Sequence, residues 1–206
     1  MFDTSQLAMR AADAIKGQCD LNHDQYEIVT YSLELVFIGL LGFVLAVAVG
    51  LFFGVGLLTF LCMLSGALVR TFAGGGHCSA GIRCAVASII FAPLALFSHF
   101  LGGVLNSFQA TLLVFIVTMV LLVAVHLWAP AEAPNKPIKN SLHRSRLRLI
   151  AFVVVLLIAS VSLMAKNDSI TIALLFGAAF QVFAITPLGV KMISLIDRFL
   201  LQIGIR

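Results

Sequence analysis

The sequence has few charged side chains for its length. Only 11% of its 206 residues are Asp, Glu, Lys or Arg, whereas 61% are apolar and the mean hydropathy is +1.11. A soluble domain typically has about 25% charged and about 45–50% apolar residues. So short a chain cannot bury all of this apolar surface in its own core, so lipid must be the solvent for much of it. The composition excludes an ordinary soluble domain and predicts an integral membrane protein.

Other features that are scarce or missing narrow the class of membrane protein further. One Trp and two Tyr stand against 17 Phe, which is typical of lipid-facing helices. No pair of cysteines has the spacing of a disulfide framework, so we expect free thiols at Cys19, Cys62, Cys78 and Cys84. Residues 1–30 are rich in charge and contain no continuous apolar core, so we expect no cleaved signal peptide. No inverted repeat of the kind common in transporters is visible.

Uncharged apolar runs predict an all-α, polytopic protein with about six transmembrane helices. A helix rises about 1.5 Å per residue, so crossing about 30 Å of hydrocarbon takes roughly 20 residues. The first run, 35–69, is too long for one span. Gly50, Gly54 and Gly56 near its middle predict a helical hairpin, and one long, kinked helix is the alternative. The later spans are expected at 84–101, 108–128, 149–165 and 170–188.

We expect a single membrane domain, residues 1–206, with amphipathic interfacial segments at both ends, 1–32 and 191–206. Two polar segments, 70–83 and 130–148, separate spans. In this arrangement 12 of the 13 Lys and Arg residues fall on one side of the membrane. Because basic residues collect on the cytoplasmic side, both polar segments and both termini are predicted to be cytoplasmic in a multi-pass protein of a bacterial cell membrane.

The polar segment 70–83 and the adjoining Cys84 concentrate a histidine, two cysteines, two arginines and four glycines. A cysteine nucleophile needs an imidazole base within about 2.6–3.2 Å. His77 and Cys84 are seven residues apart, which on a straight helix would separate them by about 10.5 Å along the axis. A pair therefore requires His77 to lie in the loop and fold back over the start of the third span, as the glycines permit. There the helix N-terminus, Arg70 and Arg83 would stabilise a thiolate, and backbone N–H groups are candidate oxyanion donors.

Arg70, Gly75, His77 and Cys84 occur in the same order as in the accessory gene regulator B family, which the segment resembles. The stretch 129–138, an acidic residue followed by Asn-Lys-Pro-Ile, is similar to that family's central cytoplasmic loop. The members are membrane endopeptidases that process propeptides in Gram-positive quorum sensing. The resemblance covers nearly the whole chain.

The resemblance implies that His77 and Cys84 are the catalytic pair. It implies a short, AgrD-like precursor peptide as substrate, cleaved in its C-terminal part through a thioester on Cys84. It also implies that cleavage is coupled to formation of a cyclic thiolactone or lactone autoinducing peptide.

Other residues receive supporting roles. Arg70, Gly75 and Arg83 are expected to support the site, donate to an oxyanion or position substrate. The basic loop could hold an acidic propeptide tail and touch anionic membrane lipids, and its candidate residues are Lys136, Lys139, Arg144 and Arg146. A homodimer is a further expected partnership. No metal, other cofactor or nucleic acid is expected.

Two other function classes stay open on the residues alone. A metal-dependent membrane hydrolase could use His77, Cys78 and Cys84 as ligands, and chelators rather than thiol alkylators would then inactivate it. A small transporter would show substrate-dependent flux and tolerate loss of Cys84, but the scarcity of ionisable groups deep in the spans argues against a proton-coupled carrier. Cys78 is the alternative nucleophile, although adjacent side chains seldom form a well-aligned pair with one another.

Overall fold

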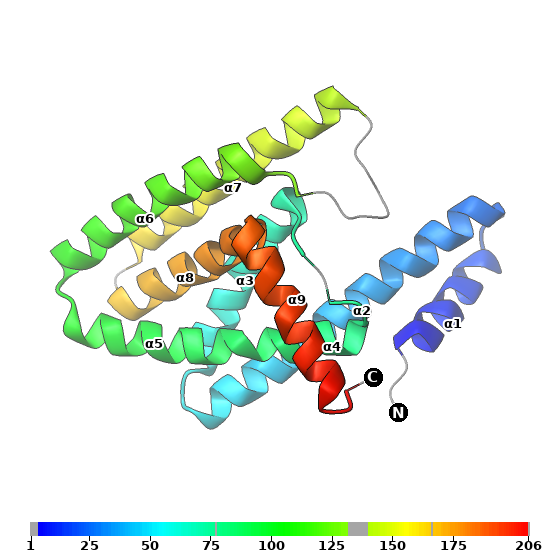
Figure 1. Cartoon of the computed structure of the whole chain (residues 1–206), viewed down its shortest axis with the longest axis horizontal. Coiled ribbons are helices and arrows are strands. Elements are labelled where there is room, and N and C mark those ends of the chain that lie inside the picture. Colours follow the sequence, from blue (N-terminus) through cyan, green and yellow to red (C-terminus); the bar gives the residue numbers. More distant parts are fainter. Residues whose placement is uncertain (1–3, 77, 132–139, 166, 206) are drawn as a thin grey trace.

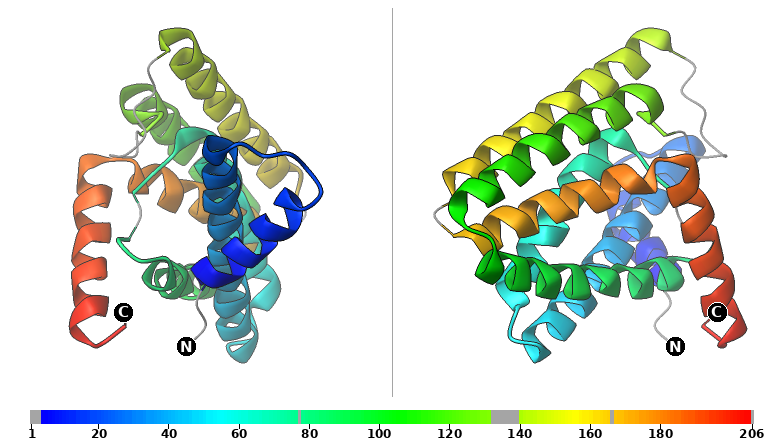
Figure 2. Two further views of the ribbon diagram at one scale, coloured as in Figure 1. Left: turned by 90° about the vertical axis from the view of Figure 1, so that its right-hand side faces the viewer. Right: turned by 60° about the vertical axis from the view of Figure 1, so that its left-hand side comes forward.

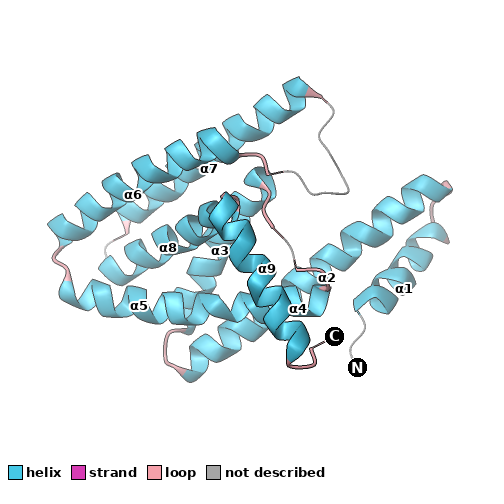
Figure 3. Ribbon diagram, viewed as in Figure 1, coloured by secondary structure: helices cyan, strands magenta, loops and turns pink. Residues whose placement is uncertain are grey.

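The protein is helical throughout the part that is described, residues 4–76, 78–131, 140–165 and 167–205 of a computed structural model (Figure 3). The predicted all-α class is therefore confirmed. In chain order the elements, labelled in Figure 1, are α1 (Thr4–Lys16), α2 (His23–Phe52), α3 (Gly56–Ala73), α4 (Gly81–Ala87), the 3-10 turn η1 (Ser88–Ile90), α5 (Phe91–Val104), α6 (Ser107–Trp128), α7 (Ser141–Met164), α8 (Asp168–Ala184) and α9 (Pro187–Gln202).

The long apolar run near the N-terminus folds as the predicted hairpin. α2 ends at Phe52 and α3 begins at Gly56, so the chain reverses within three residues. Gly54 in this turn has a φ of +73°, a conformation that side chains with a Cβ seldom adopt. The structure excludes the alternative of one long helix. α2 itself begins at His23, well before the apolar run, and directly follows the cap formed by Asn22.

Five helical segments in the described chain are long and apolar enough to cross a bilayer, namely α2, α3, the α4–α5 unit, α6 and α7. α8 has 17 residues, or about 25 Å at 1.5 Å per residue, which is at the short end of the spanning range. After α8 the chain bends by 88° into α9. Thr186 caps α9 and Pro187 occupies its first turn, so the break has a local cause. The structure thus supports a multi-pass protein with five to six spans.

α3 and α8 pack together at the centre of the bundle, with α5 and α7 in contact with both of them and α6 with α8. Gly177 of α8 faces the backbone of α3 so closely that a Cβ there would lie 1.8 Å from the Cys62 carbonyl oxygen. Small residues at such contacts are typical of helix packing in membranes, because they let backbones approach. Cys62 is fully buried in this core.

The amphipathic helices lie at the ends of the chain. α1 packs beside α2, as the left view of Figure 2 shows, and α9 contacts α4. Many large apolar side chains on α2, α6 and α7 are exposed, among them Val44, Phe115 and Leu157. A surface of this kind needs lipid around it, in agreement with the composition.

Polar contacts between loops gather at two separate ends of the bundle. At one end Ser107 Oγ donates to Asp168 Oδ2 at 3.3 Å. At the other end the Ala131 N–H donates to the Ala73 carbonyl oxygen at 2.8 Å. The segment after α3 and the segment after α6 therefore share one end, as the distribution of basic residues predicts. Which side of a membrane this end faces stays a prediction.

Candidate active site

The reactive segment predicted from the sequence connects α3 to α4. α3 ends at Ala73, three glycines follow, and α4 begins at Gly81. Cys84 is the fourth residue of α4, and its N–H donates to the Ala80 carbonyl oxygen at 3.2 Å. That N–H is therefore engaged within the helix. His77, the predicted base, lies outside the described residues, whereas its chain neighbours Gly76 and Cys78 are described.

Two polar side chains hold the glycine run in place. Gln181 of α8 donates from Nε2 to the Gly74 carbonyl oxygen at 2.9 Å. Arg70 of α3 donates from Nη2 to the Gly76 carbonyl oxygen at 2.9 Å, and from Nη1 to Gln181 Oε1 at 3.4 Å. Between these contacts Gly75 has a φ of +146°, and a Cβ there would lie 2.7 Å from Gln181 Nε2. Arg70, predicted as a supporting residue, therefore binds the backbone that leads to His77. Gly75, also predicted as a supporting residue, is part of that backbone.

Sequence reasoning missed Gln181. It is 3% exposed and lies in a helix that is otherwise almost wholly apolar. A buried amide costs free energy unless it is hydrogen-bonded, so a lone amide in an apolar span indicates a partner elsewhere in the fold. A single Gln in an apolar helix is visible in the sequence, but the sequence does not show which residues it binds.

The basic loop between α6 and α7 starts beside the reactive segment. Gly74 forms an isolated β-bridge with Ala131, and Arg148 Nε donates to the Ala129 carbonyl oxygen at 2.9 Å. Arg144 and Arg146 are exposed in the first turns of α7, so part of the predicted loop is helical. Lys136 and Lys139 lie outside the described residues.

The thiols of Cys78 and Cys84 meet across the reactive segment. Both residues are half-buried, and the two side chains are hydrogen-bonded to one another. This hydrogen bond, followed by burial, raises the pKa of the Cys78 thiol far above its ordinary range. Cys78 is therefore protonated at neutral pH. All four cysteines lie within the described residues and are free thiols, as predicted.

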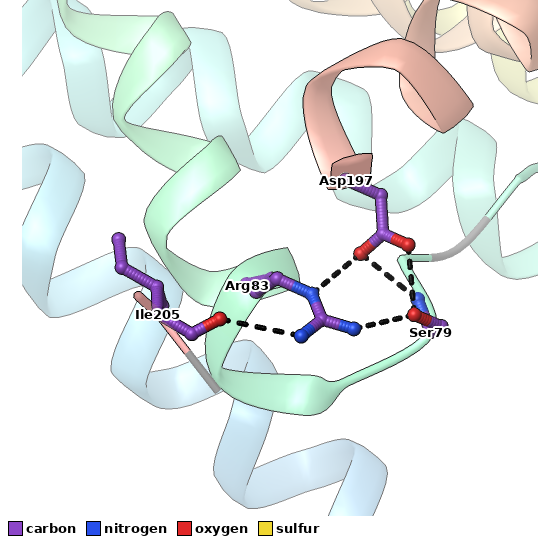
Figure 4. Close-up of polar contacts among 4 residues, drawn as sticks. All are labelled: Ser79, Arg83, Asp197 and Ile205. Carbon is purple, nitrogen blue, oxygen red and sulfur yellow. Dashed lines mark hydrogen bonds and ion pairs between the residues drawn. The ribbon is translucent and has the colours of Figure 1, made fainter. Parts of the chain in front are cut away.

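Arg83 connects the reactive segment to the C-terminal helix (Figure 4). Its Nε donates to Asp197 Oδ1 at 2.7 Å, its Nη1 to the Ile205 carbonyl oxygen at 3.2 Å, and its Nη2 to Ser79 Oγ. Ser79 in turn donates to Asp197 from its N–H at 3.2 Å and from its Oγ at 2.7 Å. The guanidinium, predicted as a supporting group or oxyanion donor, is thus engaged on all three nitrogens by the protein itself.

The carboxyl group of Asp197 is the acceptor at the centre of these contacts. Desolvation alone would raise its pKa, but the hydrogen bonds from Ser79 and Arg83 and the positive charge of Arg83 outweigh that effect and lower it. Asp197 is therefore a carboxylate at neutral pH. Its role was not predicted from the sequence.

Within the described part of the chain, no group of three His, Cys, Asp or Glu side chains could hold a metal ion. The alternative ligand set of His77, Cys78 and Cys84 includes one residue outside that part.

Comparison with known proteins places the sequence of this chain in a family. The model of the family described as accessory gene regulator B matches residues 8–185. The chain belongs to this family. The match includes the reactive segment and ends before α9 begins.

Curated relatives cover nearly the same length. The AgrB-like protein of Listeria monocytogenes serovar 1/2a is 26% identical over 191 residues, or 91% of each chain. That of Listeria innocua serovar 6a is 26% identical over 195 residues, again 91% of each chain. AgrB-like protein 2 of Clostridium perfringens strain 13 is 23% identical over 202 residues, 91% of this chain and 94% of its own. No solved structure matches the chain at a significant level.

Proposed function

We propose that this AgrB-like membrane protein is a cysteine endopeptidase that cleaves a short precursor peptide and closes part of it into a ring. Cys84 is the nucleophile and His77 the general base. The observation that carries the proposal is the position of Cys84 at the start of α4, in contact with a segment that Arg70, Gly75 and Gln181 hold in place. All of these residues lie within the region that matches the family.

The raised pKa of the Cys78 thiol argues against Cys78 as the nucleophile. Only a thiolate is a good nucleophile, and the raised pKa of Cys78 keeps that thiol protonated. A protonated Cys78 is a hydrogen-bond donor toward the Cys84 sulfur. His77 directly precedes Cys78, whose side chain interacts with that of Cys84, so this position in the chain is a suitable one for the base.

The chemistry follows from these roles. His77 accepts the proton of the Cys84 thiol, and the thiolate attacks the carbonyl carbon at the cleavage site of the precursor. The C–N bond breaks, His77 returns the proton to the departing amine, and the C-terminal fragment leaves. The rest of the peptide is now a thioester on Cys84.

Ring closure uses this thioester. An internal Cys or Ser of the precursor gives its proton to His77 and attacks the carbonyl carbon of the thioester. The bond to the Cys84 sulfur breaks, this sulfur takes up the proton, and a thiolactone or lactone is released. Tethering gives the internal nucleophile a high effective concentration over water. Making a thioester from an amide is uphill, whereas exchanging one thioester for another is nearly neutral. Ring formation therefore depends on removal of the cleaved fragment.

Further partners belong to the same proposal. The exposed Arg144 and Arg146, with Lys136 and Lys139, would hold an acidic C-terminal tail of the precursor at the membrane surface and contact anionic lipids. A homodimer is compatible with these roles. We further propose that the reactive segment, the basic loop and both termini are cytoplasmic.

The test is cleavage of a precursor by the full chain in membranes. A suitable precursor is a short peptide with an internal Cys or Ser and an acidic tail, taken from the neighbouring reading frames. Cys84→Ala should lower the cleavage rate by at least about 1,000-fold because it removes the nucleophile. Cys78→Ala, the matched control, should stay within about tenfold of the wild-type rate because it removes only a donor. Normal cleavage by Cys84→Ala would refute the proposal.

The covalent step has its own readout. A precursor with Ala in place of the internal Cys or Ser cannot close a ring, so mass spectrometry should find it attached to Cys84. His77→Ala should slow formation of this adduct by about 100-fold or more. Formation of the adduct at the normal rate in His77→Ala would show that the base is another group.

Inhibitor class separates this proposal from the alternatives. A thiol alkylator should abolish cleavage and a chelator should leave it unchanged. Loss of activity with the chelator would favour a metal hydrolase that uses His77, Cys78 and Cys84. Substrate flux that survives Cys84→Ala would favour a transporter.

A further inference from the structure

The C-terminal helix α9 lies against the segment that carries Cys84, although it is outside the region that matches the family (Figures 1 and 2). α9 follows the sharp bend after α8 and reaches α4. Near its middle, the Ile193 side chain comes within 3.2 Å of the Cβ position of Gly76. One turn later Asp197 binds Ser79 and Arg83. α9 therefore contacts the chain on both sides of residues 77–78.

The Asp197 contacts are not those of an ordinary surface ion pair. The side chains of Arg83 and Asp197 are only 7% and 17% exposed. An exposed pair contributes little because water competes for both charges, whereas a pair removed from water requires nearly complete hydrogen bonding. Here Asp197 accepts three hydrogen bonds and Arg83 donates three. Figure 4 shows these contacts together.

The two residues that Asp197 binds are the immediate neighbours of the two thiols. Ser79 directly follows Cys78, and Arg83 directly precedes Cys84. One carboxylate therefore contacts the residue beside each thiol. Displacement of Asp197 would remove a contact from both of these residues at once.

We propose that Asp197 is a positioning residue of the candidate active site, acting through Ser79 and Arg83 to set the relative placement of Cys78 and Cys84. It does not touch the reacting atoms. Its effect on cleavage rests on the proposed peptidase function, whereas its effect on the two thiols is a property of the fold. A helix at the membrane surface would thereby control the geometry of the site.

The first experiment measures the thiols directly, in the full chain in membranes. Iodoacetamide is the probe, and mass spectrometry of cysteine-containing peptides gives a rate for each thiol from neutral to alkaline pH. Asp197→Asn should raise the alkylation rate of Cys78 by about fivefold or more at mildly alkaline pH. It removes a negative charge that disfavours the Cys78 thiolate and loosens the contact with Cys84. Asp197→Glu keeps the charge and should restore most of the wild-type behaviour.

Two controls belong to this experiment. Glu27→Gln removes an exposed carboxylate outside the site and should leave the rates of Cys78 and Cys84 unchanged. Cys19 is an exposed thiol in the same molecule and should react at one rate in every variant. If Asp197→Asn fails to fold, Ser79→Ala removes the hydroxyl group, which donates one of the three hydrogen bonds to the carboxylate and accepts one from Arg83. It keeps the backbone N–H contact and the ion pair, and it should change Cys78 in the same direction. Wild-type rates for Cys78 and Cys84 in a folded Asp197→Asn or Ser79→Ala chain would overturn the proposal.

The second experiment measures precursor cleavage. Asp197→Asn should lower kcat by about tenfold or more and leave KM within about twofold, because alignment rather than peptide binding is lost. Arg83→Lys combined with Asp197→Asn should be no worse than the more impaired single variant, because both act through one contact. Additive losses would overturn a shared role. If the wild-type chain cleaves no precursor while Asp197→Asn still changes the thiol rates, the peptidase function fails and the positioning role stands.

Discussion

At the scale of single residues, the candidate site depends on buried polar groups whose hydrogen bonds are made within the protein. Gln181 is buried in an apolar helix, and both ends of its amide are used, one by Arg70 and one by the Gly74 carbonyl oxygen. A buried polar group that lost its partner would carry the full cost of desolvation, about 1–3 kcal/mol. These contacts therefore favour one conformation of the glycine run over its alternatives.

Gly75 gives a residue-scale prediction. Gly75→Ala should lower precursor cleavage by about tenfold or more, because the φ of +146° is strained for alanine and the new Cβ would lie 2.7 Å from Gln181 Nε2. Membrane insertion should be unchanged. Gly103→Ala is the matched control, since no atom lies within 4 Å of the added Cβ. A normal cleavage rate in Gly75→Ala would show that this conformation does not matter for the site.

At the scale of elements, the contact between α3 and α8 places the site. Arg70 comes from the last turn of α3 and Gln181 from the last turn of α8, so the two helices must pack in one register for these side chains to meet. At Gly177, one turn before Gln181, the backbones approach so closely that no Cβ fits between them. The register between α3 and α8 thus determines the conformation of the glycine run that follows α3.

This dependence gives an element-scale prediction. Gly177→Ala should lower the thermal unfolding midpoint in detergent, with a cost of about 1–3 kcal/mol, because the added Cβ would lie 1.8 Å from a backbone oxygen that cannot rotate away. Gly39→Ala in α2 is the matched control, a helical glycine with open space around its Cβ position. The same midpoint in both variants would mean that α3 and α8 can separate at little cost.

At the scale of the whole molecule, the distribution of charge predicts orientation. Cysteines placed singly at positions 140 and 168, in a chain without its native thiols, can be labelled with an impermeant maleimide. Position 168 begins α8 at the end that holds the contact between Ser107 and Asp168, and it should react in intact cells. Position 140 precedes α7 at the other end and should react only after permeabilisation. Labelling of position 140 in intact cells would invert the proposed orientation.

Sequence alone determined the all-α class, the hairpin within residues 35–69 and the place of Cys84 at a helix start. These features depend on local chemistry: the length of apolar runs, the conformational freedom of glycine and the side chains beside a helix end. The residues that hold the site in place were decided only by the tertiary structure. Gln181 is 107 positions from Gly74, and Asp197 is 114 positions from Arg83. No periodicity or spacing in a chain encodes such a pairing, because the partners meet only after separate helices have packed and the chain has bent back after α8.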